Sequence, residues 1–306
     1  MVELHKYSGA GNDFVVLDGR FEDVSAFRTP EHISFFCKKY STDGLMILTA
    51  DPDYDFRMEF YNPDGSGGMM CGNGGRCIVA FADELGLVPR AGGVFRFLAA
   101  DGPHTGEILR QAQDDGARFP GGRKTVRLRM IDVKVFHPAL DGWFVDTGTR
   151  HFVRFVPDAE AVDVETEGRR ARWDPVFAPV GANANFVSVD PDGTLRVRTF
   201  EKGVEGETLA CGTGITAAAI ATYLTSTTPS HGSADAALRA GGPSFAGHEK
   251  SARQILGHPG STTPTHASVV YYNIQARIDR LAVEFRPVPD GGFSDVYLIG
   301  PAEEIR

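Results

Sequence analysis

Hydrophobic and polar positions alternate over many short stretches of the chain, and this pattern predicts a molecule built mainly from β-strands. The stretches are rich in Val, Ile, Leu, Phe and Tyr, and several place apolar side chains at every second position, as half-buried strands do. We expect strands at residues 13–17, 45–48, 55–61, 126–130, 152–156, 185–189, 195–200, 281–285 and 296–299.

Two segments are apolar at almost every position, and we expect each to be a helix buried in a core. Residues 76–85 stop before Gly86, and residues 215–224 form the second segment. Each follows a glycine-rich turn that begins with Cys-Gly, at Cys71 and at Cys211. The two cysteines therefore stand at corresponding positions, each just before a predicted buried helix.

The order of the motifs indicates that the chain consists of two related halves. Gly-Ala-Gly-Asn-Asp-Phe-Val at residues 9–15 is echoed by Gly-Ala-Asn-Ala-Asn-Phe-Val at residues 181–187, and a predicted strand precedes each Cys-Gly turn at nearly the same interval. Two polar, turn-rich stretches, 105–124 and 225–266, interrupt this order. We expect mobile surface loops there, with a short helix near residues 234–239.

Composition and charge exclude several classes of function. The 306 residues carry a formal net charge of −9 with a pI near 5.5, and they show no basic patch for a nucleic acid or an anionic membrane surface. No apolar run reaches the roughly 18–20 residues that a membrane-spanning helix needs, and the N-terminus shows no apolar signal region. We therefore expect a cytoplasmic protein without nucleic-acid or membrane partners.

The cysteines are the main candidates for chemistry. Cys37, Cys71, Cys77 and Cys211 show neither a CxxC pair nor a zinc-ligand spacing, so we predict thiols and no metal site. We assign Cys37 and Cys77 to packing. A thiol just before a helix faces unpaired backbone N–H groups and the positive end of the helix dipole, which favour the thiolate. The neighbouring glycines let the same amides approach a bound anion.

Two equivalent thiols suit the inversion of a carbon centre. Without a cofactor, one group must remove a proton from one face of the carbon and a second group must deliver a proton to the other. Because the Cα–H of an amino acid is very weakly acidic, the carbanion also needs stabilisation, which amides aimed at the α-carboxylate provide. The duplicated turns thus favour a cofactor-independent amino-acid epimerase with Cys71 and Cys211 as base and acid.

Four motifs together resemble the diaminopimelate epimerase family. They are Gly-Asn-Asp-Phe at 11–14, Phe-Tyr-Asn-Pro-Asp-Gly-Ser at 60–66, Cys-Gly-Asn-Gly-Gly-Arg-Cys at 71–77 and Glu-Thr-Leu-Ala-Cys-Gly-Thr-Gly at 207–214. The resemblance runs from Tyr7 to about Leu224 and resumes at residues 291–296. The two polar insertions fall outside it.

The resemblance implies an isomerase that interconverts LL- and meso-diaminopimelate without pyridoxal phosphate or another cofactor, in lysine and peptidoglycan biosynthesis. It also implies an α+β fold of two pseudo-symmetric domains, each a mixed, largely antiparallel, barrel-like sheet around a central apolar helix, with the active site in the cleft between them. We place the first domain at residues 1–134, completed by a C-terminal strand at about 294–306, and the second at 135–293, including the insertion at about 225–266. The implied partner is a small-molecule substrate, and a homodimer is the assembly that we consider.

Carried onto this sequence, the resemblance implies roles for residues around both turns. Cys71 and Cys211 match the acid–base pair, and His151 and Glu201 match residues that assist the two thiols. The substrate-binding positions are Asn12, Asn62, Gly72, Asn73, Thr149, Asn183, Glu201, Lys202, Gly212 and Thr213. No metal ligand is implied.

Three positions depart from the commonest pattern of the family. Many members have Asn-Pro-His where this chain has Thr149-Arg150-His151, so the Asn contact is either lost or supplied by Thr149. Lys202 replaces the arginine of Glu-Arg-Gly and lacks its bidentate fork. Gly44 stands where some members have a substrate-binding Gln. These changes bear on substrate affinity more than on the chemistry of the thiols.

Two other interpretations compete with this one. A two-cysteine racemase acting on proline or hydroxyproline would use the same chemistry, but the Asn-rich positions and the Glu201–Lys202 pair favour a substrate with a second charged end. Outside enzymes, two activated thiols could form a redox switch by closing a disulfide.

Overall fold

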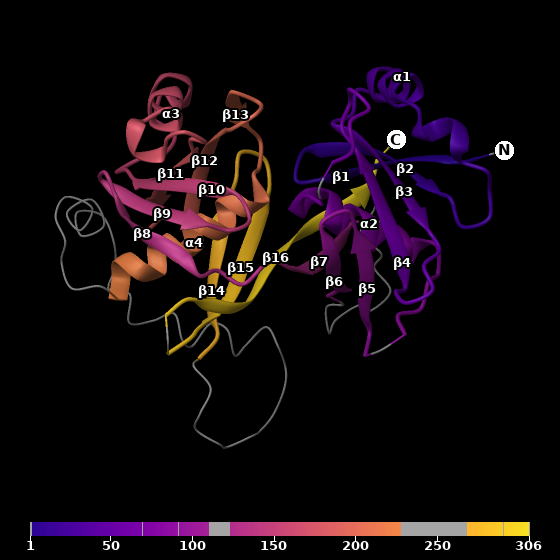
Figure 1. The fold of residues 1–306 in the computed structure, drawn as a ribbon. Coiled ribbons are helices and arrows are strands. Elements are labelled where there is room, and N and C mark those ends of the chain that lie inside the picture. Colours follow the sequence, from indigo (N-terminus) through magenta and orange to yellow (C-terminus); the bar gives the residue numbers. More distant parts are fainter. Residues whose placement is uncertain are drawn as a thin grey trace, which may run out of the picture. The chain divides into compact units, whose positions relative to one another are not determined.

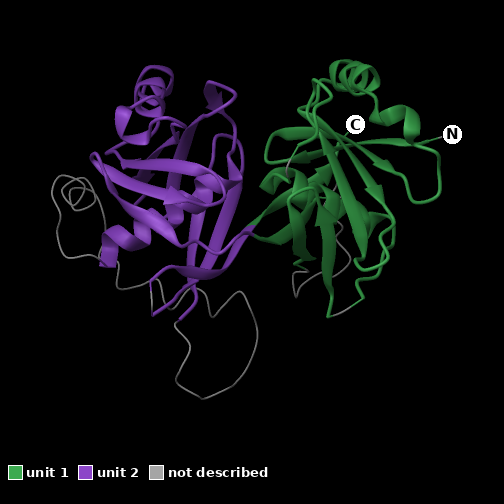
Figure 2. Ribbon diagram, in the orientation of Figure 1, with its two compact units in different colours: residues 1–129, 299–306 green, residues 130–298 purple. Residues whose placement is uncertain are grey.

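The computed structural model describes residues 2–68, 70–90, 92–109, 123–227, 268–289 and 291–305. By its internal contacts the chain divides into two compact units (Figures 1 and 2). Unit 1 comprises residues 1–129 and 299–306, and unit 2 comprises residues 130–298. The last strand, β16 (Phe293–Glu304), begins in unit 2 and ends in unit 1.

In unit 1 the strands form a closed barrel. The strands are β1 (Leu4–Gly9), β2 (Asn12–Asp18), β3 (Gly44–Thr49), β4 (Phe56–Tyr61), β5 (Val94–Ala99), β6 (Gly102–Ile108), β7 (Lys124–Arg129) and the end of β16. They follow one another in this order, and β16 pairs back with β1, where Ser8 lies opposite Glu303. The pairs β2–β3 and β4–β5 are parallel, and β1–β2, β3–β4, β5–β6 and β6–β7 are antiparallel. Closure leaves this sheet without a free edge.

Helix α2 (Gly72–Glu84) lies inside the barrel of unit 1, where residues 72–82 are all buried. It packs against β1, β2, β3, β6 and β7. Outside the barrel, α1 (Pro30–Tyr40), preceded by the short 3-10 helix η1 (Ser25–Arg28), covers β2 and β3. The buried Ile33 and Cys37 of α1 join a cluster that includes Val15 and Leu45. The chain thus buries its most apolar helix at the centre and its amphipathic helix on the outside.

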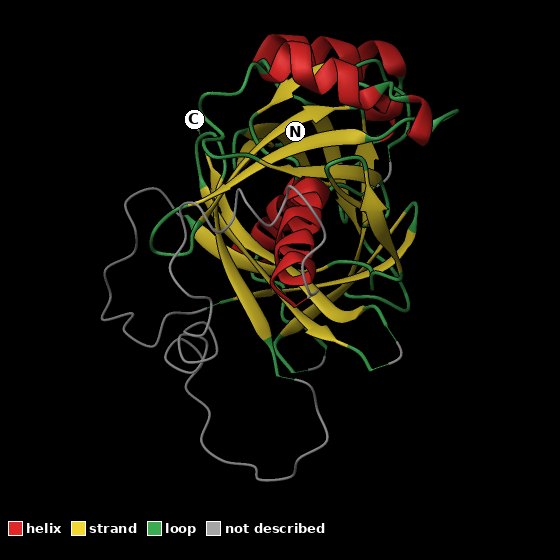
Figure 3. Ribbon diagram, turned by 90° about the vertical axis from the view of Figure 1, so that its left-hand side faces the viewer, coloured by secondary structure: helices red, strands yellow, loops and turns green. Residues whose placement is uncertain are grey.

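Unit 2 repeats this plan. Its strands are β8 (Val135–Ala139), β9 (Gly142–Asp146), β10 (Arg150–Phe155), β11 (Asn183–Val189), β12 (Leu195–Glu201), β14 (Val270–Gln275), β15 (Arg280–Pro287) and the start of β16, in that order, with β13 (Gly206–Thr208) paired to β12. A bridge between Val133 and Phe293 joins the two ends of the sheet. Inside lies α4 (Gly212–Thr227), which packs against β9, β10, β11, β12 and β15 (Figure 3).

The outer face of unit 2 carries α3 (Val164–Arg172) and the 3-10 helix η2 (Pro175–Phe177). Helix α3 packs against β11, β12 and β13. Beneath them lies a core that includes Phe152, Phe177, Phe186 and Phe200. Alternate positions of β10, β11 and β12 therefore face two different surroundings: α4 inside the sheet and the α3 core outside it.

The α+β fold, with barrel-like sheets around central helices, is confirmed, as are the nine expected strands and the two buried helices. Three boundaries of the expected insertions are wrong. Residues 105–108 continue β6, Lys124 already belongs to β7, and Thr225 to Thr227 continue α4, where the hydroxyl groups of Thr225 and Thr227 bond to carbonyls of the preceding turn of the helix. Residues 110–122 and 228–266, which include the helix expected near 234–239, lie outside the described residues. No helix in the described part of the chain is long and apolar enough to cross a membrane.

Candidate active site

Cys71 is the N-cap of α2. Its backbone is extended, with φ −103° and ψ 151°, and its sulfur accepts a hydrogen bond from the amide of Gly74 at 3.2 Å. The carbonyl of Cys71 accepts the first helical hydrogen bond, from Gly75. A cysteine here takes the place that Ser, Thr, Asp or Asn usually fills. The sulfur, partly exposed, lies at the positive end of the helix dipole, which favours its anionic form.

Asn12 and Asn73, both predicted site residues, are in direct contact. The Asn73 side chain donates to Asn12 Oδ1 and accepts from Arg76 Nη2 at 2.9 Å, while Asn12 donates to Asp43 at 3.2 Å. Arg76 is fully buried and also donates to the carbonyls of Gly72 and Pro301. Arg76 therefore stabilises the Cys-Gly turn from inside the barrel. Through this turn it also positions Asn73, which contacts Asn12.

Asn62 and Gly44 lie at neighbouring strand ends of the same barrel. Asn62 follows β4, and its amide donates to Ser66 Oγ at 3.0 Å across a tight turn. A β-carbon placed on Gly44 would lie 2.8 Å from the carbonyl oxygen of Tyr61 and 3.0 Å from the ring of Phe60. Any side chain at position 44, glutamine included, would thus collide with β4. The departure at Gly44 is imposed by packing in this chain.

Cys211 occupies the corresponding position before α4. Its carbonyl accepts the first helical bond, from the amide of Ile215 at 2.9 Å, as that of Cys71 does in α2. The sulfur is buried and lies 3.4 Å from the hydroxyl of Thr213. The hydroxyl of Thr216 bonds to the carbonyl of Gly212. The two cysteines therefore share a local geometry, and a side-chain hydroxyl accompanies the second.

His151 joins the Cys211 turn to the strands of unit 2. Its imidazole is fully buried, with Nε2 at 2.8 Å from Thr149 Oγ1 and 3.0 Å from Thr213 Oγ1. Burial lowers the pKa of His151 to about 3, so the ring is neutral at pH 7. Its other nitrogen, Nδ1, lies 3.1 Å from the amide of Asn185. The predicted residues Thr149, His151 and Thr213 are thus brought together beside Cys211.

Asn185 was not expected at the site from the sequence. It is fully buried in β11, two residues after Asn183, and so faces the same side of the sheet. The signal that could have found it is an asparagine on the inner face of an otherwise apolar strand, since a buried amide needs polar partners.

Asn183, Glu201 and Lys202 lie where β10, β11 and β12 meet the loops. The Asn183 side chain donates to the carbonyl of Arg150 at 3.0 Å and accepts from the backbone amide of Lys202 at 2.7 Å. Glu201 accepts a hydrogen bond from the hydroxyl of Thr208 at 2.9 Å, and burial raises the pKa of its carboxyl group. Asn183 therefore ties the strand end beside His151 to the one that carries Glu201 and Lys202.

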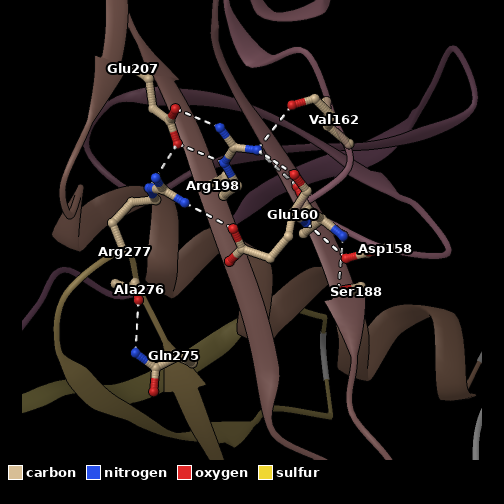
Figure 4. Close-up of polar contacts among 10 residues, drawn as sticks. Asp158, Glu160, Val162, Ser188, Arg198, Glu207, Gln275, Ala276 and Arg277 are labelled. Atoms are coloured by element: carbon tan, nitrogen blue, oxygen red, sulfur yellow. Dashed lines mark hydrogen bonds and ion pairs between the residues drawn. The ribbon is translucent and has the colours of Figure 1, made fainter.

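A network of ion pairs anchors the segment that leads into Cys211 (Figure 4). Arg198 binds Glu207 through two bonds of 2.7 Å and donates to the carbonyls of Ala159, Glu160 and Val162. Arg277 pairs with Glu160 at 2.8 Å and with Glu207 at 3.5 Å. This network fixes β13 through Glu207, which lies four residues before Cys211.

The other two cysteines have surroundings suited to packing. Cys77 lies fully buried within α2 and Cys37 within α1, and burial raises the pKa of each thiol. In the described residues, no group of three or more His, Cys, Asp and Glu side chains is arranged to hold a metal ion.

Comparison with known proteins places this geometry in a family. The model of the diaminopimelate epimerase family matches residues 4–102 and 143–253. Diaminopimelate epimerase from Chlorobaculum tepidum is 39% identical over 224 residues, which cover 71% of this chain and 81% of that protein. The enzyme of the same name from Aquifex aeolicus is 39% identical over 235 residues, covering 73% and 82%.

Solved structures of lower identity share the fold. A phenazine biosynthesis protein of the PhzF family from Bacillus anthracis superposes with a TM-score of 0.62 at 12% identity, covering 99% of this chain and 96% of that one. A probable proline racemase from Agrobacterium radiobacter gives 0.56 at 15% identity, covering 100% and 91%. Together with the close sequence relatives, which extend over most of the chain, these findings make the protein an isomerase that belongs to the diaminopimelate epimerase family.

Proposed function

We propose that this protein interconverts LL- and meso-diaminopimelate, with Cys71 and Cys211 as the two groups that exchange protons with Cα. The observation that carries the proposal is the recurrence of one local structure in a chain of this family. In each unit a cysteine stands directly before the central helix and begins a Cys-Gly-X-Gly turn. Inversion at Cα needs a proton acceptor on one face and a proton donor on the other. Two equivalent cysteines can supply both.

In the proposed reaction the thiolate of one cysteine takes the Cα proton of the substrate. The C–H bond breaks, an S–H bond forms, and the electron pair stays on Cα, delocalised into the α-carboxylate. The thiol of the other cysteine then gives its proton to the opposite face and becomes the thiolate. No net oxidation occurs, and the reverse reaction restores the first cysteine to its starting state. The chemistry therefore calls for no cofactor.

The helix starts supply the electrostatic part of catalysis in this proposal. The backbone amides of Gly72 and Asn73 in one turn, and of Gly212 and Thr213 in the other, stand at the positive ends of α2 and α4. Bound to the α-carboxylate, such preorganised donors stabilise the negative charge that develops on deprotonation, an effect of typically about 3–4 kcal/mol for one donor in enzymes.

We assign the remaining predicted residues to substrate binding and to support of the thiols. Asn12, Asn62 and Asn183 offer amide groups, and Glu201 and Lys202 offer opposite charges for the distal amino-acid end of diaminopimelate. Lys202 would contact a carboxylate through one ammonium group, without the paired bonds of an arginine. His151 acts beside Cys211 as a neutral hydrogen-bonding group, because its pKa lies far below neutrality.

The biological setting follows from the substrate. An enzyme that makes meso-diaminopimelate serves lysine and peptidoglycan biosynthesis, and a reducing cytoplasm would keep both thiols available. A homodimer is the assembly that we propose, and light scattering on the purified protein measures it.

Turnover in deuterium oxide tests the function. Reduced protein is given LL-diaminopimelate, and both epimers are analysed by mass and by NMR as the reaction proceeds. We expect meso-diaminopimelate to form with deuterium at the inverted Cα, while the LL-form recovered early stays largely unlabelled, because the proton arrives from the second thiol. Absence of both inversion and labelling would refute the function, and equal early labelling of both epimers would refute the two-base mechanism. L-Proline, run in parallel, is expected to remain unlabelled.

A further inference from the structure

The orientation of the Asn185 amide is fixed by its surroundings. Its nitrogen lies 3.0 Å from the carbonyl of Phe152, and its oxygen accepts a bond from the hydroxyl of Thr199 at 2.9 Å. Were the amide turned over, its oxygen would face the Phe152 carbonyl, and two acceptors would meet in a buried site. The nitrogen of Asn185 must therefore point toward Phe152 and toward His151.

This orientation selects one tautomer of His151. The second hydrogen of the Asn185 amide points at Nδ1 of the imidazole, 3.1 Å away. Because Nδ1 faces a donor, it must accept, and the single proton of the neutral ring lies on Nε2. His151 consequently donates through Nε2 to the threonine hydroxyls beside it.

From Nε2 the donors continue in one direction toward the sulfur. The His151 Nε2–H lies 2.8 Å from Thr149 Oγ1 and 3.0 Å from Thr213 Oγ1, and the Thr149 hydroxyl donates to Thr213 Oγ1 at 3.0 Å. The Thr213 hydroxyl is then left to donate to Cys211 Sγ at 3.4 Å. A hydroxyl that donates to a thiolate makes a charge-assisted bond, stronger than one to a neutral thiol. Bonds aligned in one direction also polarise one another.

We propose that Asn185 is a positioning residue that, through His151, Thr149 and Thr213, stabilises the thiolate form of Cys211. The inference rests on the function proposed above, since it deepens the role of Cys211 as a base. It gives Thr149, a departure from the family pattern, a place in the chain of donors. The close packing of Gly214 against this group supports it, because a β-carbon there would lie 2.4 Å from Asn185 Oδ1.

Other titratable and charged groups lie around α4. The titratable side chains on the inner face of the surrounding strands are His151 on β10 and Glu201 on β12, and Tyr272 on β14 faces the C-terminal end of α4, beside Tyr223 and Ser226. On alternate positions facing outward lie Asp146, Arg150, Arg154, Arg196, Arg198, Arg280, Glu284 and Arg286. Glu201, whose carboxyl accepts from Thr208, would repel a nearby thiolate when ionised, and its effect is common to all variants compared below.

The first test measures how fast Cys211 is alkylated by iodoacetamide between about pH 5 and pH 10, by peptide mass spectrometry in a Cys71→Ala background. Only the thiolate reacts, so the rate profile reports the ionisation of the thiol. Thr213→Val, which removes the hydroxyl next to the sulfur, should move the profile up by about one pH unit and slow alkylation at neutral pH by up to about tenfold. Thr213→Ser, which keeps the donor, should leave the profile in place.

Thr147→Val is the matched control, because the Thr147 hydroxyl bonds to the backbone carbonyl of Thr213 at 3.0 Å and stands outside the chain of donors. The profile of Thr147→Val should match that of the parent. An unchanged profile in Thr213→Val, or an equal displacement in Thr147→Val, would overturn the proposal. Because alkylation needs no substrate, either result leaves the test of turnover independent.

The second test observes the tautomer of His151 directly in the unaltered protein, so it does not depend on whether a variant folds. In the ¹⁵N spectrum of the unaltered protein, with His151→Gln used only for assignment, Nδ1 of His151 should resonate as an unprotonated imidazole nitrogen and Nε2 as a protonated one. A proton on Nδ1 would contradict the orientation of Asn185 and overturn the proposal, even where the protein epimerises diaminopimelate at its full rate.

Discussion

Each cysteine proposed as acid and base also stands at the start of a helix, and the two roles can be separated. Cys71 caps α2 through its sulfur, and serine fits the same position with a stronger acceptor for the Gly74 amide. We therefore expect Cys71→Ser and Cys211→Ser to fold with stability close to that of the parent. Each should lose epimerase activity by about 10²–10⁴-fold, because a serine hydroxyl is far less acidic than a thiol at neutral pH.

Cys37→Ala is the control for these variants, since this thiol is buried in α1 away from either turn. It should lower thermal stability by removing a packed side chain while leaving the rate of deuterium incorporation within a factor of about two. Parental activity in either serine variant would contradict the assignment of that cysteine as acid and base.

Gly214 is required by close packing at the start of α4. A β-carbon there would lie 2.4 Å from Asn185 Oδ1 and 3.3 Å from His151 Cε1. Gly214→Ala should lower the free energy of unfolding of unit 2 by about 1–3 kcal/mol, the usual cost of overpacking, and should lower kcat by displacing His151. Gly206→Ala is the control in the same unit, because the nearest atom to its β-carbon would be the flexible Glu165 carboxylate at 3.4 Å.

Urea titration measures these changes. Both tryptophans, Trp143 and Trp173, lie in unit 2, so tryptophan fluorescence reports the unfolding of this unit. Equal stabilities of the two glycine variants would show that Asn185 and His151 move aside at little cost.

At the scale of secondary elements, the sequence predicts well wherever apolar periodicity dominates. Helices α2 and α4 were predictable because both are apolar nearly all round. Helix α3 was missed because its core contacts are Val164, Gly168, Ala171 and Arg172 among charged neighbours, which gives no apolar stripe. Helix α1, also missed, does carry signals in the Thr29 cap and in Pro30 at its first position.

The site itself was predictable in part, for a related reason. Cys71, Cys211 and the glycines beside them belong to continuous motifs. The contact between His151 and Asn185 instead depends on the parallel register of β10 and β11, in which His151 lies opposite Asn183. A register between strands separated by a helix is set by tertiary packing and cannot be read from local periodicity.

The anchoring of β13 yields a prediction at this scale. Arg198 is only 12% exposed and holds Glu207 together with three carbonyl groups, whereas Arg277 and Glu160 are 37% and 50% exposed. Arg198→Met should therefore lower the free energy of unfolding of unit 2 by about 2–3 kcal/mol, since it leaves polar groups without their donor. Arg277→Met should lower it by less than about 1 kcal/mol, as exposed ion pairs contribute little.

The same pair of variants tests whether β13 positions the turn that begins at Cys211. Arg198→Met should also lower kcat, because Glu207 lies four residues before Cys211, while Arg277→Met should retain nearly all activity. A larger loss of stability in Arg277→Met than in Arg198→Met would show that the exposed pair, and not the buried one, anchors the segment.

At the scale of the whole chain, the decisive contacts join residues far apart in sequence. Ser8 pairs with Glu303 to close the barrel of unit 1, and Val133 bridges Phe293 in unit 2. Neither pairing can be recognised from the local sequence, because a strand that closes a barrel has the same pattern of residues as any other strand. The sequence could therefore indicate two related halves while leaving closure of each sheet to be found in the structure.

The pH dependence of stability should carry the signature of His151. Its pKa is about 3 in the folded state, against the ordinary value of 6.5 in the unfolded chain. Between these values the unfolded chain binds one proton more than the folded chain, so stability falls as the pH falls from about 6.5. Glu201 has the opposite effect on stability at a pH just above its ordinary pKa. Because its pKa is raised in the folded state, the folded chain takes up a proton there before the unfolded chain does, and stability rises as the pH falls.

The contribution of His151 is isolated by subtraction. His151→Gln loses hydrogen bonds at every pH, but it no longer forces a neutral imidazole on the folded state. The stability advantage of the parent over His151→Gln, followed by tryptophan fluorescence, should shrink by up to about 1.4 kcal/mol for each pH unit below about 6. Glu201 is common to both proteins and cancels, and His137→Gln gives the baseline for an exposed histidine of the same unit. A constant difference in the free energy of unfolding between parent and His151→Gln from pH 7 to pH 5 would mean that His151 takes up a proton in the folded protein. The chain of donors, which requires a neutral imidazole, would then be lost at acidic pH.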